Sequence, residues 1–156
     1  MKINYKKINS LVLLLLLVPV LLLSGCGTPE NGSDFIKAQK LLQYQEDKYK
    51  DAEATGTLEN GVRTIYIKAY QFYFEPTTII VNKGEKIRLI ISAEDVPHGF
   101  EIEGFEIPDY DINTVIRKGT PLVLEFTADK KGVWDFICTI FCGFGHSTMR
   151  GIFVVR

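Results

Sequence analysis

Two kinds of hydrophobic pattern follow each other along the chain. Residues 34–53 are polar with scattered apolar side chains, and Ser33 or Asp34 precedes them as a helix N-cap, so we expect a helix there. From Val62 onward, short runs of β-branched and aromatic residues alternate with turn residues. These runs are Thr64–Lys68, Ile79–Val81, Lys86–Ser92, Leu122–Thr127, Val133–Ile137 and Ile152–Val155. About six to eight strands with no helical period between them predict an all-β, antiparallel sandwich or barrel.

The N-terminal residues have the pattern of a signal peptide. Three lysines within residues 2–7 precede the apolar run Leu11–Leu23, which is shorter than the ~20 residues of a membrane span. Leu23-Ser24-Gly25-Cys26 resembles the bacterial lipobox, which implies cleavage before Cys26 and diacylation of its thiol. An uncleaved anchor is the alternative. Both interpretations place the remaining chain outside the cytoplasmic membrane, and two acyl chains suffice for stable attachment.

The expected organisation has three parts. Residues 1–25 are a lipoprotein signal peptide, residues 26–61 a lipid-anchored linker with the helix at about 34–53, and residues 62–156 one globular domain. The helix is a spacer packed loosely on the domain, or a docking helix for a membrane partner.

The amino-acid composition excludes several classes of protein. With 46% hydrophobic and 24% charged residues and a net charge of −1, the chain has the composition of one globular domain. This excludes a disordered chain, a multi-pass membrane protein and a strongly basic nucleic-acid binder. The sequence contains no phosphate-binding glycine loop, nucleophile elbow or c-type haem motif, so it predicts no catalytic site of its own.

The scarce residue types gather in one region. Of 3 Cys, 2 His and 2 Met, all except Met1 and Cys26 lie from residue 98 onward. His98 follows one predicted strand, and Cys138, Cys142, His146 and Met149 form the pattern C-x3-C-x3-H-x2-M before the last one. Loops at strand ends meet at one pole of a sandwich, and thiolate, imidazole and thioether together favour copper.

The number of thiols decides how many ions fit. A single blue copper needs one Cys, two His and a weak axial Met, and this chain offers one thiolate more. Both sulfurs can instead bridge two coppers that take one His each. Two alternatives stay open at this point: a disulfide between Cys138 and Cys142, and a structural zinc site that leaves Met149 without a role.

These motifs, with Asp95-Val-Pro-His-Gly-Phe100, resemble the CuA domain of cytochrome c oxidase subunit II over about residues 62–156. The resemblance implies a cupredoxin-like Greek-key β-sandwich with a mixed-valence two-copper centre. Its ligands would be the bridging thiolates Cys138 and Cys142, the imidazoles of His98 and His146, the weak thioether Met149 and the carbonyl of Ile140.

Three features depart from that family. Many members have Glu at the place of Ile140, where it also holds magnesium toward subunit I. Many have Gln-Trp-x-Trp where this chain has Gln71-Phe-Tyr-Phe74, so electron entry through that Trp is not expected here. A lipobox stands where the family has transmembrane helices.

Acidic residues surround His98. Residues 93–113 contain seven acids and no Lys or Arg. We expect some of them to face the copper pole and steer a basic cytochrome c, although a solvated loop with no docking role explains them equally well. The candidate docking residues are Glu94, Asp95, Glu101, Glu103 and Phe144.

The resemblance implies an electron-transfer subunit, anchored by lipid on the extracytoplasmic face of the membrane. It would relay electrons from a cytochrome c-like donor to subunit I of a haem–copper oxidase, or to a nitrous or nitric oxide reductase. The alternative function is a lipoprotein that delivers copper to an oxidase.

Overall fold

The computed structural model describes residues 32–156; the expected signal peptide and Cys26 lie outside this range. The chain divides into two compact units, residues 1–35 and 36–156. The helix α1 (Gly32–Tyr49) ends four residues earlier than the sequence pattern suggests. Among the described residues, no helix combines the length and the apolar character needed to cross a membrane.

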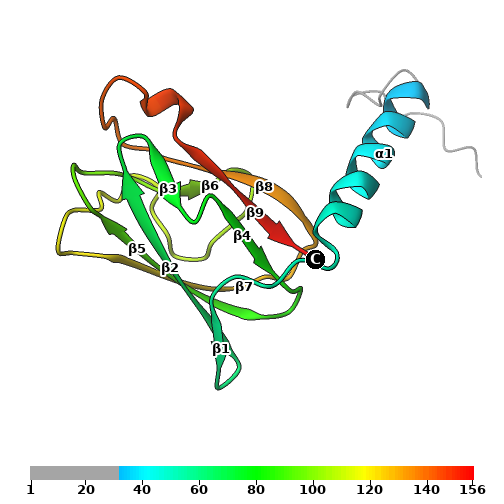
Figure 1. Cartoon of the computed structure of the whole chain (residues 1–156), viewed down its shortest axis with the longest axis horizontal. Coiled ribbons are helices and arrows are strands. Elements are labelled where there is room, and N and C mark those ends of the chain that lie inside the picture. The colour runs from blue at the N-terminus through cyan, green and yellow to red at the C-terminus, as the bar shows by residue number, and fades with distance from the viewer. Residues whose placement is uncertain (1–31) are drawn as a thin grey trace, which may run out of the picture. The chain divides into compact units, whose positions relative to one another are not determined.

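Two sheets form the rest of the described chain, and they confirm the all-β sandwich (Figure 1). The first sheet has the order β1-β2-β5-β7, and β3 also pairs with β2. Its strands are β1 (Thr57–Glu59), β2 (Val62–Tyr70), β3 (Tyr73–Glu75), β5 (Lys86–Ala93) and β7 (Leu122–Thr127). The second has the order β4-β9-β8-β6. Its strands are β4 (Thr78–Val81), β6 (Glu101–Ile102), β8 (Gly132–Ile137) and β9 (Arg150–Val155).

The sheets are mixed rather than antiparallel as predicted, because each contains one parallel pair beside its antiparallel ones. β2 runs parallel to β5, and β4 runs parallel to β9. Between β2 and β5 the chain visits the second sheet through β4 and then returns. A strand that returns through such a crossover enters from the same end as its partner, whereas a hairpin would reverse it.

The core lies between the two sheets because side chains alternate along each strand. In β2 and β5 the buried positions follow the two-residue period of a strand, with Ile65 and Ile67 opposite Leu89 and Ile91 in the parallel register. Aromatic rings from both sheets complete the core in edge-on contacts. These rings are Phe74, Phe100, Phe136, Phe105, Phe126 and Phe153.

At one end of the sandwich, the turn before β5 is bonded to the residue at the end of the C-terminal strand β9 and to the residue that follows β7. The amide of Lys83 donates to the carbonyl of Arg156 (2.9 Å), and that of Gly84 donates to Ala128 (2.7 Å). The connections that carry His98 and residues 138–149 lie at the other end of the sandwich, where they follow the C-terminal ends of β5 and β8. Pairing of Glu101 with Ile137 brings those two connections together, as the sequence predicts (Figure 1).

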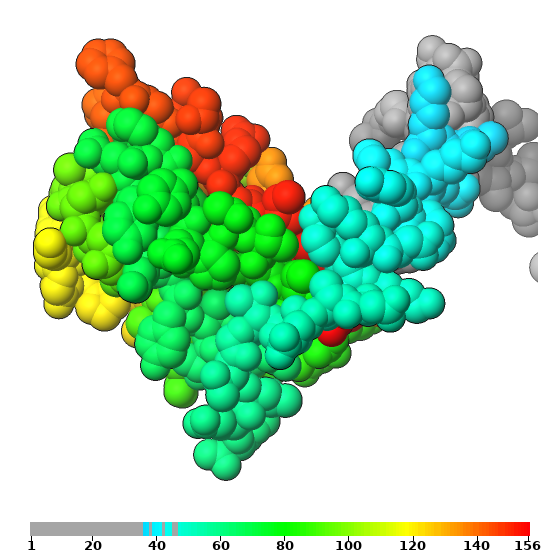
Figure 2. All heavy atoms as spheres, viewed as in Figure 1, coloured from blue at the N-terminus to red at the C-terminus, as the bar shows by residue number. Residues whose placement is uncertain are grey.

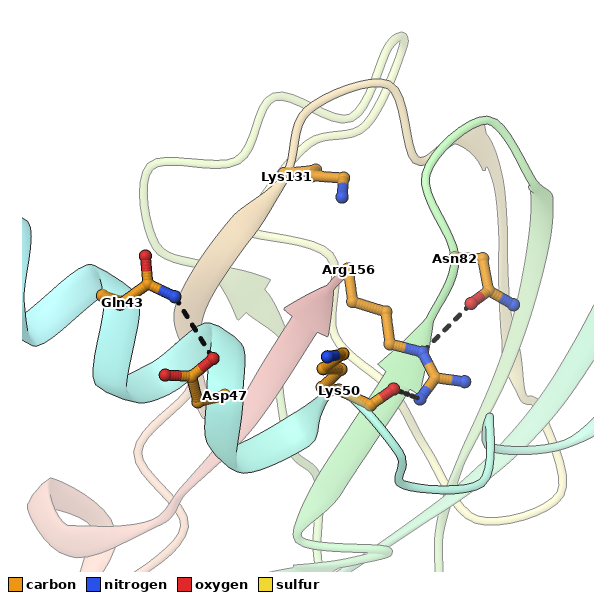
Figure 3. A pocket seen from close by; sticks show the side chains of 6 residues that line it. All are labelled: Gln43, Asp47, Lys50, Asn82, Lys131 and Arg156. Carbon is orange, nitrogen blue, oxygen red and sulfur yellow. Dashed lines mark hydrogen bonds between the residues drawn. The ribbon is translucent and has the colours of Figure 1, made fainter.

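Arg156 also holds the end of α1. Its guanidinium donates to Oδ1 of Asn82 (3.0 Å) and to the carbonyl of Lys50 (2.9 Å) (Figure 3). It also donates to the carbonyls of Tyr49 (3.1 Å) and Ala52. A cation at these carbonyls satisfies acceptors that a helix C-terminus leaves free and complements its dipole. The open pocket beside it is lined by Gln43, Asp47, Lys50, Asn82, Lys131 and Arg156.

Candidate metal centre

Three predicted ligands converge closely at the pole where β8 ends. The ligand atoms of His98, Cys138 and Cys142 all lie within 4.8 Å of one another, and all three residues are buried. Both cysteines are free thiols, so the predicted alternative of a disulfide does not describe this structure. The amide of Cys138 donates to the carbonyl of Met149 (3.2 Å) and so closes the loop that carries the remaining ligands.

Each thiol has its own histidine. Nδ1 of His98 lies 3.7 Å from Sγ of Cys138, and Nδ1 of His146 lies 3.7 Å from Sγ of Cys142. The weaker donors are divided in the same way. Sδ of Met149 lies 3.8 Å from Sγ of Cys142, while the carbonyl oxygen of Ile140 lies 3.2 Å from Sγ of Cys138. The donor atoms therefore fall into two halves, each with one thiol, one imidazole and one weaker donor, and their soft sulfur and imidazole chemistry fits copper.

His98 is fixed on every side. Its ring is fully buried, and Nε2 lies 2.8 Å from Oδ1 of Asp95. Its backbone exchanges two hydrogen bonds with Ile116, of 3.1 and 2.8 Å. A carboxylate at one ring nitrogen leaves the other, Nδ1, aimed at Cys138, which is how proteins orient imidazole ligands.

The carboxylate of Asp95 is held in its charged form. Burial disfavours the charge, but donors from the Gln71 and Val96 amides and from His98 outweigh burial and keep the pKa of Asp95 below its ordinary value. Asp95 was predicted as a docking residue. In the structure one of its oxygens contacts the predicted metal ligand His98, and the side chain is one-third exposed.

At two positions of the loop that carries Cys142 and His146, the backbone conformation favours glycine. Gly143 and Gly145 have φ of 126° and 130°, and a Cβ atom at Gly145 would lie 2.5 Å from the ring of Phe72. The short 3-10 helix His146–Thr148 follows and delivers Met149, whose side chain is 1% exposed, to the core side of the loop.

Gly99 lies at a close approach of the two ligand-bearing connections that the sequence analysis missed. A Cβ atom there would lie 2.1 Å from Oγ1 of Thr139 and 2.9 Å from the amide nitrogen of Ile140. The Gly99 amide itself lies 3.5 Å from Sγ of Cys138. The two ligand-bearing connections therefore touch backbone to backbone, and His-Gly in the motif was the only signal of this contact.

Burial strongly affects the Cys142 thiol of the metal-free protein. Burial, as the largest cause, and the neighbouring Cys138 together raise the pKa of the Cys142 thiol to about 11. The thiol is therefore protonated near neutral pH until a cation replaces its proton, so that metal uptake releases protons.

The exposed groups around the centre include two aromatic rings. Phe144 is 98% exposed and Phe141 is 73% exposed, and the ring of Phe141 lies 5.8 Å from that of His146. This segment projects as the orange surface in Figure 2. Of the other predicted docking residues, Glu103 is exposed, whereas Glu94 and Glu101 are half-buried.

Comparison with known proteins identifies the family of this chain. The cupredoxin-like domain family matches residues 45–155. Cytochrome c oxidase subunit 2 of Thermus thermophilus is 34% identical over 113 residues, which cover 72% of this chain and 80% of that protein. Nitrous-oxide reductase of Ralstonia nicotianae is 32% identical over 112 residues, but these span only 17% of the reductase.

Two solved structures share the fold. A chain of a heme-copper terminal oxidase dimer superposes with a TM-score of 0.52 at 23% identity, over 80% of this chain and 92% of its own. The periplasmic domain of subunit II of cytochrome oxidase from Bradyrhizobium japonicum gives 0.50 at 19% identity, over 64% and 88%. The chain belongs to the cupredoxin-like family and, within it, to the relatives of cytochrome c oxidase subunit 2.

Proposed function

We propose that this chain is an electron-transfer protein with a two-copper centre of the CuA type, which relays single electrons from a cytochrome c-like donor to a haem–copper oxidase. The division of the donors into two thiol–imidazole pairs, each with a 3.7 Å separation, is the observation that carries the proposal. A single blue copper would leave one thiolate without a role, and a single zinc bound by both thiolates and both imidazoles would leave Met149 without one. The family membership supports copper as the metal.

The residues present suit rapid outer-sphere transfer. Copper supplies the one-electron chemistry when it is bound. The chain contributes rigidity, because Cys138 follows a core strand, His98 is clamped by Asp95 and Met149 is buried. Ligands that are held in place before and after electron arrival lower the cost of reorganisation, which is the same benefit that preorganised groups give to catalysis.

Metal analysis of the full-length protein, purified in detergent and loaded with copper, tests the proposal. We expect two coppers per chain and an electron paramagnetic resonance signal of one unpaired electron shared over both. Cys138→Ser and Cys142→Ser should each abolish this signal, whereas Ser147→Ala, at an exposed position on the same loop, should retain it. One exchangeable copper per chain would contradict the proposal and favour copper delivery, and a bound zinc would favour a structural site.

The N-terminal expectation is a second part of the proposal. We infer that Cys26 is diacylated and holds the domain of residues 62–156 on the extracytoplasmic face of the membrane, near the oxidase it would serve. Labelling of cells with a fatty acid should mark the wild-type chain but not Cys26→Ser. Equal labelling of both chains would contradict lipidation at this cysteine.

A further inference from the structure

We propose that Gln71 is a positioning residue that fastens the two ligand-bearing connections to each other. It is not a metal ligand. It lies in the two-residue turn between β2 and β3, far in sequence from both His98 and Cys142. This role goes beyond the ligand set and rests on the proposed function only for its effect on bound copper.

The side chain of Gln71 reaches the Cys-containing loop. Its Nε2 donates to the carbonyl oxygen of Cys142 at 2.5 Å, across 71 residues of sequence. This carbonyl belongs to the residue whose Sγ lies between His146 and Met149. A hydrogen bond at this point restrains the backbone of a ligand rather than its side chain.

The backbone of Gln71 reaches the other connection. Its amide donates to Oδ2 of Asp95 at 2.7 Å, while Oδ1 of the same carboxylate lies 2.8 Å from Nε2 of His98. One residue therefore connects, through a single carboxylate, the buried histidine of one half-site with the cysteine of the other half-site. The covalent chain provides no comparable short link between Cys142 and His98.

The next residue extends the contact. A Cβ atom at Gly143 would lie 2.9 Å from Nε2 of Gln71, and one at Gly145 would lie 2.5 Å from the ring of Phe72. The two glycines thus allow the ligand loop to lie directly on the Gln71-Phe72 turn. Phe72 supplies apolar contact, and Gln71 supplies the directional bond.

The matching substitution is Gln71→Met, which keeps the length of the side chain and removes its donors. In the metal-free full-length protein, amide hydrogen exchange of residues 138–149 should become about 3 to 10 times faster, as expected for loss of one hydrogen bond. Exchange in β2 and β5 and the midpoint of thermal unfolding should change little. In the copper-loaded protein, release of copper to an excess of chelator should accelerate by a similar factor, and the reduction potential should shift.

Gln43→Met is the control, because Gln43 loses only an exposed bond to Asp47 (3.2 Å) within α1. It should behave as wild type in every measurement. The inference is overturned if Gln71→Met and Gln43→Met show the same exchange in residues 138–149. Should Gln71→Met not fold, Gln71→Glu has nearly the same shape but cannot donate when ionised, and the same comparison applies to it. Failure of the wild type to bind two coppers would contradict the proposed function instead, since the exchange measurement needs no metal.

Discussion

Asp95 holds His98 from the side opposite the thiols: Oδ1 lies 2.8 Å from Nε2, while Nδ1 of the same ring lies 3.7 Å from Sγ of Cys138. The buried ring therefore has one nitrogen committed to a carboxylate and the other directed at the centre. This arrangement is typical of metal-binding histidines, where the carboxylate fixes both the tautomer and the ring orientation.

Asp95→Ala is expected to weaken copper binding about 10- to 100-fold, because the ring loses its orienting partner. A copper titration against a competing chelator measures this. Glu94→Ala is the matched control, since Glu94 accepts a bond from Ser92 (2.6 Å) and contacts no predicted ligand in the described structure. Equal affinities of the two variants would show that the acid at position 95 has no special role.

The strands were predictable because their side-chain period is local. Residues 122–127 and most of β2, β5, β8 and β9 were expected from alternation and turn residues alone. The direction of pairing was not, since it depends on where the chain goes between β2 and β5. The very short strands β1, β3 and β6 carry too few residues to show a period.

The metal ligands were predictable for a different reason. Cys, His and Met are scarce in this chain, so their spacing stands out in the sequence. The side chain of Gln71 and the backbone of Gly99 contact residues about 40 or more positions away, and neither residue type indicates such a contact in the sequence. Their roles emerge only when the two connections are placed side by side.

Gly99→Ala should separate the two ligand-bearing connections. The added Cβ would lie 2.1 Å from Thr139 and 2.9 Å from the Ile140 amide, and the latter is backbone that cannot rotate away. We expect a loss of about 1 to 3 kcal/mol in unfolding free energy, with a marked drop in copper affinity. Gly104→Ala tests the opposite case, because a Cβ there meets open space and only its φ of 75° is unfavourable. If Gly99→Ala bound copper as tightly as Gly104→Ala, the close approach would be irrelevant to the centre.

Met149→Leu should leave the fold intact but change the electronic properties of the centre. Leu has nearly the volume of Met, so a substitution at this 1% exposed position is expected to cost less than about 1.5 kcal/mol. Loss of the thioether removes electron donation that favours the oxidised metal, so the reduction potential should rise. Voltammetry measures this potential. An unchanged value would show that Sδ of Met149, although it lies 3.8 Å from Sγ of Cys142, does not bind the metal.

Acid should weaken the fold through Glu85. Its carboxylate accepts bonds from Arg63 (2.7 and 2.9 Å), which lower the pKa to about 2 despite partial burial. Because the folded-state pKa lies below the unfolded one, the carboxylate stabilises the protein above the ordinary pKa of Glu. That contribution, about 3 kcal/mol, is lost as pH falls from about 4.5 to 2.

Glu85→Gln should therefore lower the unfolding free energy at pH 7 and flatten its decline below pH 4.5, as urea titrations at several pH values would show. The control is Glu125→Gln, which removes the exposed pair with Arg88 (2.6 Å) and should cost at most about 1 kcal/mol. A parallel acid decline in wild type and Glu85→Gln would mean that other carboxylates dominate.

Phe144→Ser should leave stability and copper content unchanged while slowing reduction by a cytochrome c-type donor. A side chain that is 98% exposed contributes little to the fold, so a change within about 0.5 kcal/mol is expected. At an interface the same ring can be buried, and aromatic anchors commonly contribute more than about 1 kcal/mol to binding. Stopped-flow reduction of the copper-loaded protein gives the rate, with Tyr66→Ser, a 68% exposed position on β2, as the control.

Ionic strength separates the apolar from the electrostatic part of such docking. Charges at the surface are screened beyond about 8 Å at physiological salt, whereas contact between apolar rings is not. Glu103→Gln, which removes an exposed acid of the predicted docking set, should therefore reduce the salt dependence of the rate. Phe144→Ser should lower the rate at every salt concentration without changing that slope. If both variants matched wild type, this pole of the sandwich would not be where the donor binds, and electrons would have to enter from another face.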